Sequence, residues 1–354
     1  MSFGSDHYVP ILKVKRGEKR SLKRLATRLR SRMTPLLEIV EHKTDEKTLT
    51  EHLDTSFDDL GESVGAYPRV FLDVLELAPG GPPAALAVFE RATTAGFEFT
   101  PVTGISRNAD TNAALSYRAN GLALRLTRAE YEQGDLTDRL NGFIREHGLQ
   151  AEEIDLIMDL GPVENLIVDG IRNLIDAFIA DVPDHKRWRT FTLSACAFPL
   201  SMAGVDRQSH ELVLRADWIA WRDHLYQQRQ SLLRLPTFSD CAIQHPRGVE
   251  GFDFRIMQVS ASLRYTLFEQ WLLVKGVSTR FRRPTVQFHE LARKLVYGEL
   301  QSYFRGQNHC EGCTGIRSAA DGAQGFGSAE VWRHLGTMHH ISTVAEQLRL
   351  LPSS

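Results

Sequence analysis

The feature that most constrains the fold is a set of eight short apolar segments in the first 245 residues, separated by stretches of helical character. Residues 154–160 show the pattern best, because they are apolar apart from two aspartates and are followed by a Gly-Pro pair. So continuous an apolar run predicts a parallel strand that is covered on both faces. The eight predicted strands are residues 8–14, 35–40, 70–77, 99–103, 121–126, 154–160, 190–196 and 237–243.

Eight strands that alternate with helices favour a (β/α)₈, TIM-barrel-like fold of the α/β class over an open doubly wound sheet. No Gly-x-Gly-x-x-Gly follows any of the strands, so the sequence carries no dinucleotide-binding fingerprint. We therefore predict a barrel over residues 1–245.

The remaining residues, 246–354, predict a mainly helical C-terminal extension that packs on the barrel. Within it, residues 261–276 fit either a pair of strands or one buried helix. Residues 286–305 and 329–350 have the pattern of helices, and the glycine-rich residues 309–327 predict a loop.

The charge balance excludes a global electrostatic attraction to nucleic acid or to a membrane. The 42 basic and 44 acidic residues nearly cancel, although a local basic patch stays compatible with this balance. The chain has four cysteines, no apolar leader and no apolar run long enough to span a bilayer. We expect a cytoplasmic protein that does not associate with a membrane.

Polar or ionisable residues lie within or just after most of the predicted strands. They are Lys13, Lys15, Glu38, Asp73, Arg125, Asp159, Ser194 and Asp240. Between apolar neighbours in a barrel strand, such a side chain points into the lumen or lies at the strand end. Because unpaired buried charges are costly, these groups should neutralise one another or bind a ligand. Barrel enzymes carry their catalytic groups at the C-terminal mouth, where we expect these residues to meet.

The residue types suit a divalent cation and an anionic substrate. The candidate catalytic residues, as oxygen ligands of Mg²⁺ or Mn²⁺ or as acid and base, are Glu38, Asp73, Asp159 and Asp240. The candidate substrate-binding residues, which would hold a phosphate or carboxylate, are Lys13, Lys15, Arg125 and Arg215. The alternative is a salt-bridged plug that only stabilises the barrel.

Arg215 opens a segment, 215–221, that also contains Asp217, Trp218 and Trp221. This segment fits either a lid over the barrel mouth or an amphipathic helix whose tryptophans are buried. Only the lid would make Arg215 a second clamp for an anion.

Two cysteines and a pair of histidines in the last 50 residues form a candidate zinc site. Cys310 and Cys313 make a Cys-x-x-Cys, and His339 and His340 follow in the last predicted helix. Adjacent helical residues point about 100° apart, so at most one of the two histidines faces a given site; His339 is the candidate ligand. The alternative is an ordinary glycine-rich loop. A redox role is less favoured, since the motif is not predicted to open a helix after a strand.

Several segments together resemble the "beta protein" family of phages, prophages and bacteria. They are residues 8–18, 35–39, 71–74, 122–126, 156–161, 215–221, 238–241 and 332–341. The resemblance spans nearly the whole chain and implies a phage or mobile-element context, but no particular activity, substrate or cofactor. Cys310 and Cys313 are not part of the family pattern.

Two functions from different classes fit these observations. The first is an enzyme, with or without a metal, that acts on a phosphate-bearing substrate, a nucleotide or nucleic acid, in conflict between phage and host. The second is a non-catalytic protein that senses a ligand or binds a neighbouring effector or toxin. The same charges would also serve an enzyme of small carboxylates or sugars.

Overall fold

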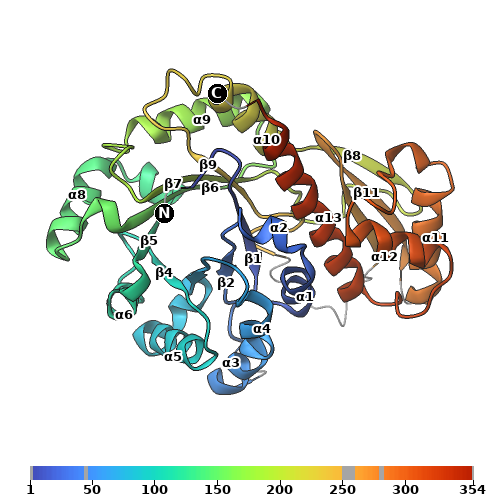
Figure 1. The fold of residues 1–354 in the computed structure, drawn as a ribbon, viewed down its shortest axis with the longest axis horizontal. Coiled ribbons are helices and arrows are strands. Elements are labelled where there is room, and N and C mark those ends of the chain that lie inside the picture. Colours follow the sequence, from blue (N-terminus) through green and yellow to red (C-terminus); the bar gives the residue numbers. More distant parts are fainter. Residues whose placement is uncertain (1–2, 44–46, 249–259, 279–282, 353–354) are drawn as a thin grey trace.

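The computed structural model describes residues 3–43, 47–248, 260–278 and 283–352, and its centre is a closed barrel of eight parallel strands (Figure 1). The strands are β1 (Tyr8–Lys13), β2 (Leu36–Glu38), β3 (Phe71–Asp73), β4 (Thr100–Thr103), β5 (Leu122–Thr127), β6 (Ile154–Pro162), β7 (Thr190–Cys196) and β9 (Thr237–Asp240). Each strand pairs with the next, and β9 closes the barrel by pairing with both β7 and β1. The predicted (β/α)₈ barrel is confirmed, and each predicted segment overlaps one of its strands.

Helices between the strands cover the outside of the barrel. They are α1 (Arg16–Arg24), α2 (Thr27–Arg30), α3 (Leu49–Phe57), α4 (Leu60–Val64), η1 (Leu75–Gly80), α5 (Gly81–Thr94), α6 (Thr111–Ser116), η2 (Arg118–Asn120), α7 (Arg128–Glu132), α8 (Leu136–Glu146), η3 (Ala151–Glu153), α9 (Val168–Ala180), α10 (Ala216–Ala220) and the π-helical turn η4 (Trp221–Tyr226). Local sequence sets several starts. Thr48 with Glu51, and Thr127 with Glu130, form capping boxes that satisfy the first amide groups of α3 and α7.

The last third of the chain adds a second layer beside the barrel. Strands β10 (Ser260–Thr266) and β11 (Gln270–Ser278) form an antiparallel hairpin, so residues 261–276 are a strand pair and not a helix. β11 also pairs with β8 (His210–Leu214), which is inserted between β7 and α10. Helices α11 (Pro284–Val296), α12 (Glu311–Ala320) and α13 (Ala329–Leu350), with η5 (Gln301–Tyr303), complete this layer. The prediction of a loop over residues 309–327 was wrong, because α12 occupies ten of them.

The long helix α13 joins the two layers. Figure 1 shows it between the barrel and the small sheet. Its residues Ile341, Val344 and Leu348 pack in the barrel's core, whereas Trp332 and Leu335 belong to a second core with β10, β11, α11 and α12. Because α13 also packs on α1 and β1, it takes the place that the final helix has in a (β/α)₈ barrel. Pairing of β8 with β11 and this packing of α13 both cross the boundary expected at residue 245.

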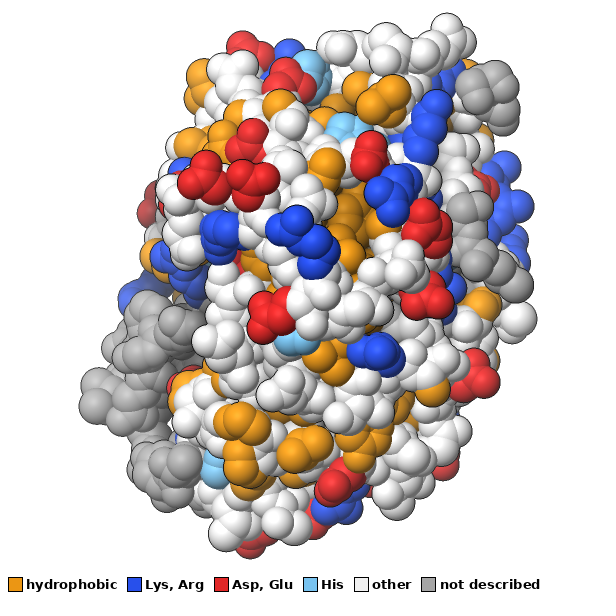
Figure 2. Space-filling view, turned by 90° about the vertical axis from the view of Figure 1, so that its left-hand side faces the viewer, with side chains coloured by type: hydrophobic (Ala, Val, Ile, Leu, Met, Phe, Trp, Pro, Cys, Tyr) orange, Lys and Arg blue, Asp and Glu red, His pale blue; other side chains and the backbone are white. Residues whose placement is uncertain are grey.

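The surface carries charges of both signs. On the face drawn in Figure 2, basic and acidic side chains are interspersed, with apolar side chains between them. None of the helices in the described part of the chain has the length and apolar character needed to cross a membrane.

Candidate functional site

Arg125 lies at the centre of a cluster of buried charges at the C-terminal mouth. Its Nη1 donates to Glu38 Oε1 at 2.7 Å and to Asp73 Oδ2 at 2.8 Å, and its Nη2 lies 2.6 Å from Asp159 Oδ2. Strand β5 pairs with neither β2 nor β3, so the bonds to Glu38 and Asp73 cross the barrel lumen, whereas Asp159 lies on the neighbouring strand β6. Three of the predicted carboxylates and one predicted cation are therefore brought together at this mouth.

A second ring of charges surrounds the first. Arg107, in the loop after β4, donates to Asp73 Oδ1 at 2.7 Å and to Asp110 Oδ2 at 2.9 Å through a different nitrogen. Lys13 pairs with Glu76 of η1. We call the whole set the mouth cluster, and its members are Lys13, Glu38, Asp73, Glu76, Arg107, Asp110, Arg125 and Asp159. Glu76, Arg107 and Asp110 were missed by sequence analysis because they follow the strands instead of ending them; only the Arg-x-x-Asp spacing of Arg107 and Asp110 hinted at a pair.

Backbone amides two residues further along the chain fix two of the carboxylates. The amide of Leu75 donates to Asp73 Oδ1 at 3.0 Å, and the amide of Gly161 donates to Asp159 Oδ1 at 2.9 Å. Gly161 has a φ of +65°, which a side chain would disfavour, so glycine suits this turn. Asp159 is thereby held toward Arg125.

The mouth cluster contains more acid than base. Its five carboxylates face three cations, a formal excess of two negative charges. Burial raises the pKa of Glu38, and this effect outweighs the lowering by the nearby charges of Arg125 and Lys13. Burial also acts to raise the pKa of Asp73, but the ion pairs with Arg107 and Arg125 prevail and lower it. The pKa values of two carboxyls that share one guanidinium are thus shifted in opposite directions.

Polar groups without partners border this cluster. The hydroxyls of Ser194 and Ser239, which are register partners at the end of β7 and β9, form no hydrogen bond with any described residue, and neither does Arg107 Nη1. Ser194 is also the register partner of Asp159 on β6. Buried polar atoms of this kind mark a place for water or a ligand.

Asp240 lies outside the lumen. It follows Phe238 by two residues, and Phe238 packs on Trp218 and Trp221 of the outer helical layer, so both side chains point outward. Its Oδ1 accepts from Tyr8 Oη at 2.5 Å, and its Oδ2 lies 3.0 Å from His340 Nε2. The structure places Asp240 between the barrel and α13 instead of at the mouth.

Arg215 is also placed away from the mouth. Its Nη1 donates to Gln347 Oε1 at 2.7 Å and to the carbonyl oxygens of Leu267 and Phe268 at 3.2 Å. Trp218 and Trp221 are fully buried, so segment 215–221 is an inward-packed helix and not a lid. Lys15, by contrast, is exposed two residues after β1, at the C-terminal end of the barrel.

The opposite end of the lumen holds a smaller charge cluster. Asp155, at the start of β6, receives hydrogen bonds from Arg69 at 3.0 Å and from Arg189 at 2.5 and 3.0 Å. The Thr190 hydroxyl donates to the same carboxylate at 2.8 Å. We call Asp155, Arg69 and Arg189 the floor cluster.

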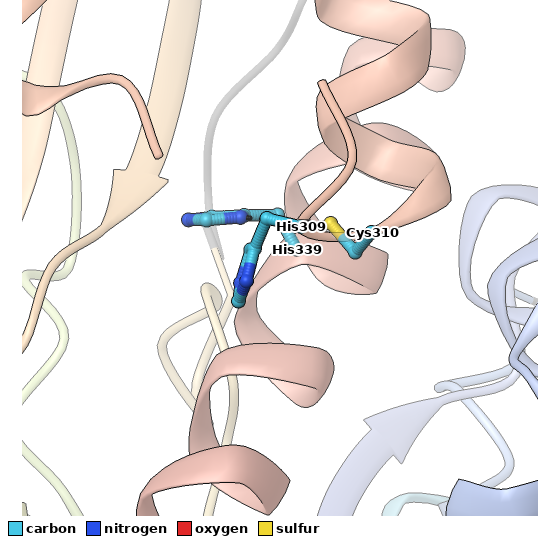
Figure 3. Close-up of side chains that lie close together, drawn as sticks. All are labelled: His309, Cys310 and His339. Carbon is cyan, nitrogen blue, oxygen red and sulfur yellow. Dashed lines mark hydrogen bonds between the residues drawn. The ribbon is translucent and has the colours of Figure 1, made fainter. Parts of the chain in front are cut away.

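A third group joins α12 to α13. His339 Nδ1 lies 3.3 Å from Cys313 Sγ and 3.7 Å from Cys310 Sγ. The ligand atoms of His309, Cys310 and His339 all lie within 4.8 Å of one another (Figure 3). We call His309, Cys310, Cys313 and His339 the thiol–imidazole cluster. As expected for adjacent helical residues, His340 faces the other way, toward Asp240.

The two thiols of this cluster differ in acidity. Hydrogen bonding with Cys313 and with His339 lowers the pKa of Cys310 to about 4, whereas the bond to Cys310 and burial raise the pKa of Cys313. Cys310 is the N-cap of α12, so the Cys-x-x-Cys opens a helix, but this helix follows η5 and not a strand.

A cavity of about 590 Å³ adjoins the thiol–imidazole cluster. His309, Cys310 and Glu311 contribute to one wall, and Met338, Ser342 and Glu346 of α13 contribute to another. Four arginines also line it, namely Arg24, Arg28, Arg32 and Arg349.

The family model described as "Beta protein" matches residues 8–346, which is nearly the whole chain. The resemblance seen in the sequence is therefore confirmed. A search of the curated proteins found no match.

Proposed function

The chain belongs to the Beta protein family, and from that premise we propose that it is an enzyme whose reaction takes place at the C-terminal mouth of the barrel. The proposed substrate bears a phosphate, as a nucleotide or a nucleic acid does. The (β/α)₈ fold supports the location, because barrel enzymes assemble their sites from the loops at this end.

The observation that carries the proposal is the contrast between Glu38 and Asp73. They are register partners on β2 and β3 and share Arg125, yet the pKa of Glu38 is raised and that of Asp73 is lowered. Such a divergence supports acid–base work by one carboxyl and a fixed negative charge on the other. In this scheme Glu38 takes up and releases a proton, and Asp73 keeps Arg125 and Arg107 in place.

The excess negative charge supports binding of a divalent cation. Oxygen ligands from Asp159, and from Glu38 when it is ionised, suit Mg²⁺ or Mn²⁺, which would polarise a phosphoryl oxygen when bound. Lys13 and the exposed Lys15 supply positive charge on the β1 side of the mouth, where an anionic substrate would enter. The free hydroxyls of Ser194 and Ser239 add hydrogen-bonding capacity.

A second candidate function is a ligand sensor or a binding partner of a neighbouring effector protein in a phage-defence or toxin system. The observation that favours it is the pairing of Arg125, whose nitrogens already bond to three carboxylates. A guanidinium that is paired with three carboxylates can serve to stabilise the barrel, and this role requires no catalysis. In either case the four free thiols suit a reducing compartment such as the cytoplasm.

The experiment that tests catalysis is a hydrolysis assay of purified protein against nucleotides and phosphodiesters with Mg²⁺ or Mn²⁺. Variants Glu38→Gln and Asp159→Asn should lose activity and remain folded if the mouth is catalytic. A purely structural cluster should instead show a lower melting temperature for Asp159→Asn, because Arg125 loses a partner. Absence of both hydrolysis and divalent-cation binding in the wild type would remove the enzyme proposal.

A further inference from the structure

We propose that Cys310, Cys313 and His339, with His309 as the fourth ligand, bind a Zn²⁺ ion that fastens α12 to α13. The proposed zinc site shares no residue with the mouth cluster, and the inference does not depend on catalysis there. It rests on the geometry of the thiol–imidazole cluster and of the groups around it.

The spacing of the donor atoms matches a tetrahedral N/S site. With zinc–sulfur bonds of about 2.3 Å and zinc–nitrogen bonds of about 2.0 Å, a tetrahedral angle separates nitrogen from sulfur by about 3.5 Å. The two separations from His339 Nδ1 are 3.3 Å to Cys313 and 3.7 Å to Cys310. Each sulfur therefore lies from His339 Nδ1 at close to the spacing that a shared zinc ion requires.

The imidazole of His339 is oriented as a metal ligand. Its Nε2 lies 2.8 Å from the carbonyl oxygen of Thr266, which can only accept, so Nε2 carries the proton. The lone pair on Nδ1 then points toward the two sulfurs. A ligand histidine whose other nitrogen donates to a backbone carbonyl is the usual arrangement in metal sites.

Tyr265 supports a thiolate at Cys313. Its hydroxyl lies 3.3 Å from Cys313 Sγ and accepts a hydrogen bond from the Arg305 amide at 3.0 Å. The hydroxyl proton is thus available to the sulfur. The Tyr265 ring also stacks on His339 at 3.8 Å between centroids, which limits rotation of the imidazole.

The backbone is built to bring the sulfurs to α13. A Cβ at Gly312 would lie 2.5 Å from the Leu335 carbonyl oxygen and 3.0 Å from the His339 amide, so only glycine permits this approach. The amide of Cys313 donates to Cys310 Sγ at 3.3 Å at the start of α12, where the helix dipole favours a thiolate.

His309 Nε2 lies 3.1 Å from Thr343 Oγ1 and its Nδ1 lies 3.6 Å from Glu346 Oε2, so His309 would complete the ligand set by exchanging one of these contacts for the ion. This histidine precedes Cys310 directly, and its ring centroid lies 5.3 Å from that of His339. Both His309 and Cys310 border the 590 Å³ cavity, which gives an ion a path to the site. Soft sulfur with imidazole nitrogen selects zinc over the Mg²⁺ or Mn²⁺ proposed for the mouth.

The test is metal analysis of the full chain after expression with added zinc and purification under reducing conditions. We expect about one zinc ion per chain, and replacement by Co²⁺ should give the absorption of a tetrahedral thiolate complex. Cys313→Ser and His339→Gln should lose the metal. Tyr265→Phe should bind zinc about 10–100-fold more weakly, as expected for loss of an outer-shell partner.

Two controls match the substitutions without touching the cluster. His334→Gln changes a histidine of the same helix that contacts Ser21, and Cys196→Ser changes a buried cysteine of the barrel. Both should retain zinc. If the ligand variants do not fold, alkylation of wild-type Cys310 still decides the question, because added zinc should slow it. Two results would overturn the site. One is wild-type protein that contains no zinc and shows no tetrahedral cobalt spectrum after Co²⁺ is added, and the other is a Cys310–Cys313 disulfide in the purified protein.

Discussion

The two ends of strand β6 carry the same residue type in the same lumen, yet their surroundings differ. Asp155 at the floor faces two arginines, and hydrogen bonds from both, together with Thr190, satisfy its carboxylate. Asp159 at the mouth shares one arginine with two other carboxylates. The floor cluster therefore has more positive than negative charge, and the mouth cluster has the reverse.

This difference separates a structural ion pair from a candidate site. Every group of the floor cluster stabilises another, which is what a buried salt bridge needs in order not to destabilise the fold. The mouth leaves one carboxyl, Glu38, with a raised pKa and leaves nearby hydroxyls without partners among the described residues. An incompletely satisfied polar group in a barrel mouth is a reason to expect a ligand.

The largest effect is expected for Arg125→Met, which removes the common partner of three buried carboxylates. We expect the free energy of unfolding to fall by about 5 kcal/mol, the upper part of the range for breaking a buried ion pair. Denaturant unfolding measures it. Arg69→Met is the matched control at the floor and should cost less, since Asp155 keeps Arg189; equal losses would show that the two ends are organised alike.

Asp155→Asn should be next, with a loss of about 3 kcal/mol, because two arginines at the floor lose their only carboxylate among the described residues. Ligand binding and activity at the mouth should not change in the folded fraction. A variant that is fully stable but inactive would place function at the floor and reverse the comparison.

Asp73→Asn should have a moderate, pH-dependent effect of about 1–3 kcal/mol. Because the folded state lowers the pKa of Asp73, its charge stabilises the fold above the ordinary carboxyl pKa of 3.8. That advantage of the wild type over the variant is lost as the pH falls through the lowered value. Unfolding measured from pH 7 to the acid limit tests it, and a constant difference would contradict the assigned shift.

Glu38→Gln should have the smallest effect on stability, within about 1 kcal/mol, and should stabilise at neutral pH. The folded state raises the pKa of Glu38, so the wild type loses stability as the pH rises through that value, whereas glutamine does not titrate. The two proteins should therefore converge in acid. A clear destabilisation at pH 7 would mean that ionised Glu38 is held as firmly as Asp73.

Sequence analysis was successful where apolar patterning decides the structure. The eight barrel strands and the meeting of Glu38, Asp73, Arg125 and Asp159 follow from short apolar runs that end in charges. Helix α13 follows from the helical pattern of residues 329–350. The direction of Asp240 did not, because β9 is short and its alternation has to be counted from Phe238, whose outward contacts only the fold reveals. Arg107 and Asp110 were missed since loop residues carry no periodicity. Helix α12 was hidden by its glycines, which serve close packing against α13 instead of a turn.

The central claim is that the mouth binds a ligand and the floor does not. Calorimetric titration of the wild type and of variants at the two ends of β6 with Mn²⁺ tests it most directly. Zinc-loaded wild type and Asp155→Asn should bind Mn²⁺ with similar affinity. Asp159→Asn should show little or no binding while remaining folded. Equal binding by all three proteins, or no binding by the wild type, would contradict the account.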